Sequence, residues 1–110
     1  MASMRIVRRD IDEIKREIGA RIDQLERDFR LLSIGELARR ADAVRHLAHT
    51  NDLMPVARLA GGLAEAIARG GRGATIRPFI DGMRDAVRGE RQDDDSASSY
   101  LAAVGVRLAG

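Results

Sequence analysis

Apolar residues recur three or four positions apart along nearly the whole chain, and no segment alternates apolar and polar residues as a strand would. This spacing puts the apolar side chains on one face of a helix. The breaks in the pattern divide the chain into a long helix over 1–32, a three-helix core over 33–89 and a C-terminal helix over 96–109. The sequence therefore predicts an all-α antiparallel bundle of four to five helices, forming one domain over 1–110.

The N-terminal segment carries the longest apolar seam. Ser3 is a suitable N-cap, and the apolar residues that follow alternate three-residue and four-residue spacings, as heptads do. The seam must pack either against a second copy, as a coiled coil, or against the rest of its own bundle. We expect a homodimer, because this helix is predicted to be longer than its successors. The side chains expected to carry self-association are Val7, Ile11, Ile14, Ile18 and Leu25.

Local signals predict where the later helices begin and end. Ser33 and Glu36 have the S-x-x-E spacing of a capping box. Asp52 is expected to cap the third helix, with Pro55 in the first turn, where a missing N–H costs little. The segment 70–73, GGRG, is expected to end that helix, with glycine in the left-handed conformation. The C-terminal helix is expected to bury Tyr100, Leu101, Val104 and Leu108.

Composition and charge narrow the classes of partner. The chain has 19 basic and 17 acidic residues with a net charge of +2, and charges of both signs are interleaved. Such a surface attracts a phosphate backbone only weakly. The absence of cysteine excludes disulfides and thiolate chemistry. No apolar run approaches the ~18 residues of a membrane span, and no signal-peptide core is present. We expect a cytoplasmic protein that does not bind membranes.

Two histidines are the first candidates for chemistry. His46 and His49 are three residues apart, within reach of one metal ion on a helix, and Asp42 or Asp52 could join them. A durable zinc site needs three or four ligands, and no H-E-x-x-H pattern is present. The carboxylates alternate with arginines at helical spacing, which is typical of solvated, salt-bridged surfaces. We expect no metal site, no cofactor and no enzymatic activity.

Residues 37–67, LARRADAVRHLAHTNDLMPVARLAGGLAEAI, resemble the central hairpin of histidine phosphotransfer (HPt) domains. Those domains carry a helix of the type L-x-R-x-A-H-x-L-K-G, then a turn, then a helix with L-x-x-x-A-x-x-L-E. The matches in the first helix and in the second, at the family's spacing, are Leu37, Arg39, Ala41, Val44, Arg45, Val56, Ala60 and Leu63.

The positions that depart from the HPt pattern are those that phosphotransfer activity would need. Asp42 stands where the phosphorylated histidine would be, and His46 stands where the family has a small glycine. Neither His46 nor His49 has the basic partner or the glycine expected after an acceptor. The resemblance thus implies a phosphotransfer-incompetent relative in bacterial signalling. Its candidate docking surface for a response-regulator or kinase domain is Asp42, Arg45, His46 and His49.

A second resemblance is to DNA-binding regulators of the mercury-resistance (MerR) type. Residues 33–41, SIGELARRA, are similar to the start of their helix-turn-helix. About four residues, including the Gly-Val turn, are missing between Ala41 and Val44, so the two helices would merge and no recognition helix would project. A small non-enzymatic interaction module is the leading hypothesis. DNA binding through Arg39, Arg40 and Arg45 is the alternative.

Overall fold

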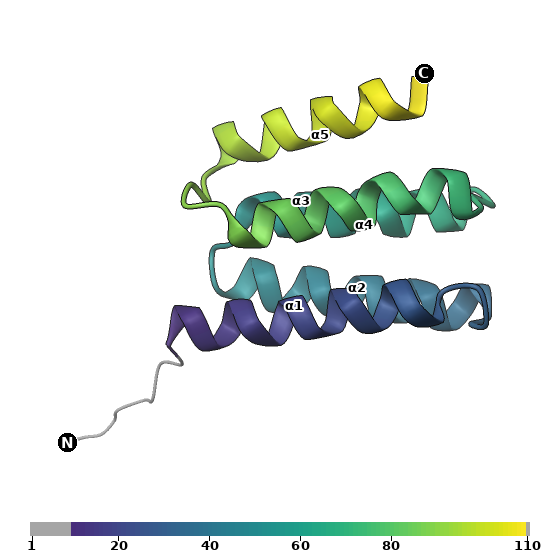
Figure 1. Ribbon diagram of the computed structural model, residues 1–110, viewed down its shortest axis with the longest axis horizontal. Coiled ribbons are helices and arrows are strands. Elements are labelled where there is room, and N and C mark those ends of the chain that lie inside the picture. The colour runs from purple at the N-terminus through teal and green to yellow at the C-terminus, as the bar shows by residue number, and fades with distance from the viewer. Residues whose placement is uncertain (1–9, 110) are drawn as a thin grey trace.

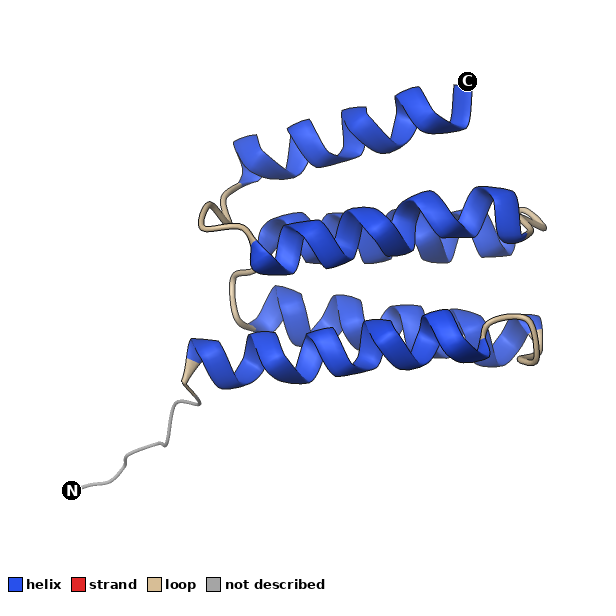
Figure 2. Ribbon diagram, in the orientation of Figure 1, coloured by secondary structure: helices blue, strands red, loops and turns tan. Residues whose placement is uncertain are grey.

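The computed structural model describes residues 10–109. This part of the chain forms five helices joined by short loops, with no strand among them (Figure 2). The prediction of an all-α fold is therefore confirmed. The helices are α1 (Ile11–Asp28), α2 (Ile34–Thr50), α3 (Met54–Ala68), α4 (Gly73–Arg88) and α5 (Asp94–Ala109).

Helices α1 to α4 close into a ring of four. α1 packs against α2 and α4, and α3 packs against the same two helices. α5 lies outside this ring, across α3 and α4, and successive helices run in opposite directions (Figure 1). The connections over residues 29–33 and 69–72 lie at the same end of the bundle, which we call the loop end.

The core between these helices is aliphatic. Among the described residues no polar or charged residue is buried, and Phe29 and Phe79 are the buried aromatic side chains. Burial of apolar surface stabilises such a core by about 25 cal/mol per Å². The largest side chains with almost no exposed surface are Ile14, Ile18, Ile22, Leu25, Leu59, Leu63, Ile67, Ile80 and Met83.

The seam expected to join two copies lies inside the single chain. Ile14, Ile18 and Leu25 are only 1%, 0% and 1% exposed, because α1 packs on α2 and α4. Ile11 is 43% exposed, and Val7 lies outside the described residues. The three buried side chains thus agree with the second interpretation of the seam, in which the helix packs against the rest of its own bundle. Self-association through them would require the bundle to open.

The prediction of a long N-terminal helix over 1–32 is also wrong in its bounds. α1 begins at Ile11, where the Asp10 carboxylate accepts a hydrogen bond from the backbone N–H of Asp12 at 3.1 Å, and it ends at Asp28. The predicted cap Ser3 lies outside the described residues. With 18 residues, α1 is one residue longer than α2, so its length does not favour a coiled coil.

Two of the predicted helix ends are confirmed. Ser33 caps α2, its hydroxyl accepting a hydrogen bond from the N–H of Glu36 at 3.1 Å. Gly70 ends α3 in the left-handed region, with φ +85°, and the N–H of Gly71 donates to the carbonyl of Ala66 at 2.8 Å. This is the hydrogen-bond pattern of a Schellman motif, in which glycine avoids the penalty of a Cβ.

Two other expectations, one about the cap of α3 and one about burial on α5, are wrong. Asp52 does not cap α3: it lies in the turn with φ 60°, and Leu53 is the residue that precedes the helix. Pro55 is in the first turn, as predicted. Of the side chains expected to be buried on α5, Val104 is buried, Tyr100 and Leu101 are only partly buried, and Leu108 is 43% exposed. The reason is that α5 lies outside the ring and only one of its faces is covered.

Candidate functional site

The four candidate docking residues project from the outer side of α2. The opposite side of this helix carries Ala41, Val44 and Ala48, which are buried against the rest of the bundle. Their three- and four-residue spacing turns the intervening positions toward solvent. We call Asp42, Arg45, His46 and His49 the α2 face: Arg45 is partly buried and the other three are exposed.

Asp42 and Arg45 form the ion pair that the sequence placed at this surface. The Nε and Nη2 atoms of Arg45 lie 2.9 Å and 2.8 Å from Oδ1 of Asp42, and the side chains are 44% and 60% exposed. The stem of Arg45 rests on α3, since its Cδ would lie 3.6 Å from a Cβ placed on Gly61. The stem of Arg45 thus lies beside α3 while the polar atoms of the pair face solvent.

The histidines of the α2 face have no metal-ligand set around them. Among residues 10–109, no group of three histidine or carboxylate side chains is arranged to hold a metal ion. Asp42, one of the two carboxylates that could join the histidines, is engaged with Arg45. His46 and His49 therefore contribute exposed polar surface, with imidazole donors and acceptors available to another molecule.

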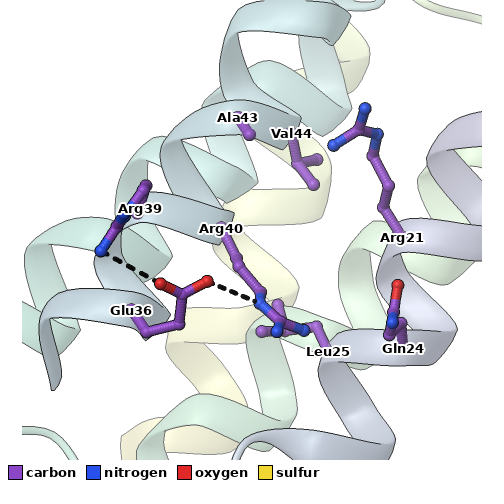
Figure 3. Close-up of a pocket in the computed structure, with 8 residues that line it drawn as sticks. All are labelled: Arg21, Gln24, Leu25, Glu36, Arg39, Arg40, Ala43 and Val44. Carbon is purple, nitrogen blue, oxygen red and sulfur yellow. Dashed lines mark hydrogen bonds and ion pairs between the residues drawn. The ribbon is translucent and has the colours of Figure 1, made fainter. Parts of the chain in front are cut away.

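A groove of about 300 Å³ runs between α1 and α2, beside the α2 face (Figure 3). Glu36 lies between two of its arginines, with carboxylate oxygens 3.1 Å from Arg39 and 3.1 Å from Arg40. The hydrogen bond to Glu36 is the main reason that the pKa of Arg40 is raised, and Asp28 adds to the effect. The third arginine, Arg21, pairs with Glu17 at 2.9 Å.

The arginines of this groove are thus neutralised by carboxylates of the same chain. The pairs within one helix follow the spacing that predicted a salt-bridged surface. The bond from Arg40 to Asp28, at 3.3 Å, joins α2 to the last turn of α1, and helical spacing alone gives no signal for it. The groove is an extension of the polar surface and offers no free cation to an anionic ligand.

Ion pairs also join α1 to α4. Arg84 donates to Asp23 at 2.9 Å and to Glu26, and Arg77 donates to Glu26 at 3.2 Å. These contacts connect residues more than 50 positions apart and bridge two helices of the ring. Their role is to hold the bundle together, so this surface is not a second candidate site.

Comparison with known proteins found no matching protein family, no matching curated protein and no matching solved structure. Within the described part of the chain, no helix combines the length and the apolar character needed to cross a membrane.

Proposed function

We propose that this protein is a small non-enzymatic module that binds other proteins, with the α2 face as its docking surface. The observation that supports this proposal most is the Asp42–Arg45 pair, which is exposed to solvent and has the stem of Arg45 beside α3. An exposed pair of opposite charges on a helix gives orientation and specificity to a partner of complementary charge. A cytoplasmic location is part of the proposal.

The HPt resemblance suggests the partner. The hairpin of α2 and α3 packs against α1 and α4, which is the arrangement that a relative of those domains needs. Asp42 has no imidazole nitrogen to accept a phosphoryl group, so the proposed role is docking without transfer. A response-regulator domain or a kinase domain is the partner that this version of the proposal requires.

Self-association is kept as a further part of the proposal. With Ile14, Ile18 and Leu25 buried in the chain's own core, a dimer would need another surface. Sedimentation velocity at tens of micromolar tests the point directly. A single monomeric species at that concentration would remove self-association from the proposal and leave the α2 face unaffected.

Binding measurements with a panel of purified response-regulator and kinase domains test the docking proposal. We expect the full chain to bind at least one domain, and Arg45→Glu to weaken that binding about ten-fold. Arg58→Glu is the matched control, since Arg58 is 48% exposed and pairs with Asp94 on another surface. No binding to any domain, or equal losses in both variants, would contradict the proposal.

DNA binding is the weaker candidate. α2 is one continuous helix from Ile34 to Thr50, and Arg39, Arg40 and Arg45 are each paired with a carboxylate. Paired arginines release few counterions from a duplex, so binding should be weak. A shift of any duplex at low salt that is lost when these three arginines are reversed would favour this function over protein docking.

A further inference from the structure

A hollow of about 380 Å³ opens at the loop end, where the α1–α2 connection meets the α3–α4 connection. Its apolar lining consists of Phe29, Leu37 and Ile76, which are 6%, 6% and 3% exposed, and of Ile34, which is 64% exposed. Ile34 is the first residue of α2, so it stands at the rim. The hollow is large enough to receive one or two apolar side chains.

The charge of this hollow differs from that of the α1–α2 groove. Arg30 and Arg72 line it, and no acidic residue does. Within residues 10–109 neither arginine makes an ion pair, unlike the arginines of the α1–α2 groove. The guanidinium of Arg30 lies 5.6 Å from the centre of the Phe29 ring, a cation–π distance, so the charge is held over the apolar wall.

The glycines of the loop leave one side of the hollow bare. Gly70 has φ +85°, and a Cβ on Gly71 would lie 2.8 Å from the carbonyl oxygen of Ala66. The end of α3 thus requires glycine at both positions. As a consequence, no side chain from these two residues fills the space beside Arg72.

A second hollow, of about 370 Å³, adjoins the first and shares Phe29, Arg30 and Gly73 with it. Arg77 and Arg107 line this one, and again no acidic residue does. Leu31, in the same connection as Arg30, is 86% exposed. Arg77 pairs with Glu26 and Arg107 pairs with Asp81. The cations that the loop end offers to another molecule are therefore Arg30 and Arg72.

We propose that the loop end binds an acidic peptide segment of a partner protein. A large apolar side chain of the segment enters the hollow beside Ile34, and its carboxylates pair with Arg30 and Arg72. This surface lies away from the α2 face, which occupies the second half of α2, so the inference does not depend on the proposed function.

The chemistry of the hollow favours this occupant over three others. Nucleic acid would use the arginines but leave the apolar lining without a partner. A bilayer surface would contact the exposed Leu31 and Ile34 but would leave the buried lining of the hollow without a partner, since only a side chain that enters the hollow reaches it. The chain's own residues 1–9 carry three arginines and no acidic residue, so their charge does not complement Arg30 and Arg72.

Selection of a random peptide library on the immobilised full-length chain tests the proposal. We expect the recovered peptides to be acidic and to carry one or two large apolar residues. Ile34→Asp and Arg72→Glu should each lower the affinity of a recovered, fluorescein-labelled peptide about ten-fold, as measured by fluorescence polarisation. Arg72 precedes α4 and Ile34 begins α2, and acidic side chains at such positions are compatible with folding. Circular dichroism verifies that both variants keep their helix content.

Ile11→Asp and Arg58→Glu are the matched controls, since they change an exposed apolar residue and an exposed arginine elsewhere. Both should leave peptide affinity unchanged. The proposal is overturned if no peptide is recovered, if the peptides are not acidic, or if the controls lose as much affinity as the test variants. It is also overturned if Ile34→Asp abolishes binding to phosphatidylserine-containing vesicles or self-association instead.

Discussion

Gly19 and Gly62 both lie inside helices, but the space around them differs. A Cβ on Gly19 would meet no atom within 4 Å, whereas a Cβ on Gly62 would lie 2.7 Å from Cε1 of Phe79. Gly62 thus allows α3 and α4 to approach closely. At the scale of a residue, adding a methyl group to a helical glycine therefore has an effect on stability that depends on what packs against that glycine.

Alanine substitutions should therefore change stability in opposite directions. Gly19→Ala should raise the free energy of unfolding by about 0.5–1 kcal/mol, because alanine is the better helix former. Gly62→Ala should lower it by about 1–3 kcal/mol, since the buried Phe79 ring must move. Urea unfolding of both variants measures the difference. Equal effects of the two substitutions would show that the Gly62–Phe79 contact does not restrict the helices.

Asp93 caps α5, and its carboxylate should make stability depend on pH. A hydrogen bond from the N–H of Ser96, at 2.8 Å, lowers the pKa of Asp93 to about 2, and Arg91 contributes. A lowered pKa means that this stabilisation is complete above pH ~4 and is lost as pH falls toward 2. Asp93→Ala should therefore be less stable than the parent at pH 7. The gap should narrow below pH 4 in urea unfolding, and a constant gap would contradict this cause.

At the scale of an element, α1 is a core helix whose two kinds of apolar position should respond differently to truncation. Ile18→Ala removes a side chain with 0% exposure and should cost about 2–5 kcal/mol of unfolding free energy. Ile11→Ala, at 43% exposure, should cost less than about 1 kcal/mol. Chemical denaturation followed by circular dichroism gives both values. Similar small losses at the two positions would argue against α1 as part of the core.

The number and type of the helices could be predicted from sequence, but not what each helix packs against. Periodicity revealed the buried side of α1, since Ile14, Ile18 and Leu25 were all chosen as seam positions. It could not distinguish a partner copy from α2 and α4, because both bury the same stripe. Local chemistry predicted the ends at Ser33 and Gly70. It failed at Asp52, where the turn took the left-handed conformation and the helix began later.

Of the two candidate sites, one could be predicted from local sequence spacing and the other could not. The Asp42–Arg45 pair is an i, i+3 contact within one helix, so its spacing predicted it. The loop-end hollow joins Ile34 and Arg30 to residues 70–73, and no local pattern indicates that these segments meet. Contacts between distant segments depend on how the four helices close their ring. Local patterns in a single sequence do not reveal that packing.

At the scale of the whole molecule, residues 10–109 form a five-helix bundle with two separate candidate surfaces. The α2 face offers an exposed ion pair and two histidines, and the loop end offers an apolar hollow whose arginines make no ion pair within residues 10–109. The proposed function depends on the first surface alone. We expect substitutions at the loop end to leave docking through the α2 face unchanged, and substitutions on the α2 face to leave the loop end unchanged.

The most direct test is an NMR titration of the ¹⁵N-labelled full chain with the response-regulator or kinase domain that binds it best. We predict that amide shifts concentrate in the second half of α2, around Asp42, Arg45 and His49, and that they diminish in Arg45→Glu. Shifts that are absent for every domain, or that concentrate on other helices, would contradict docking through the α2 face.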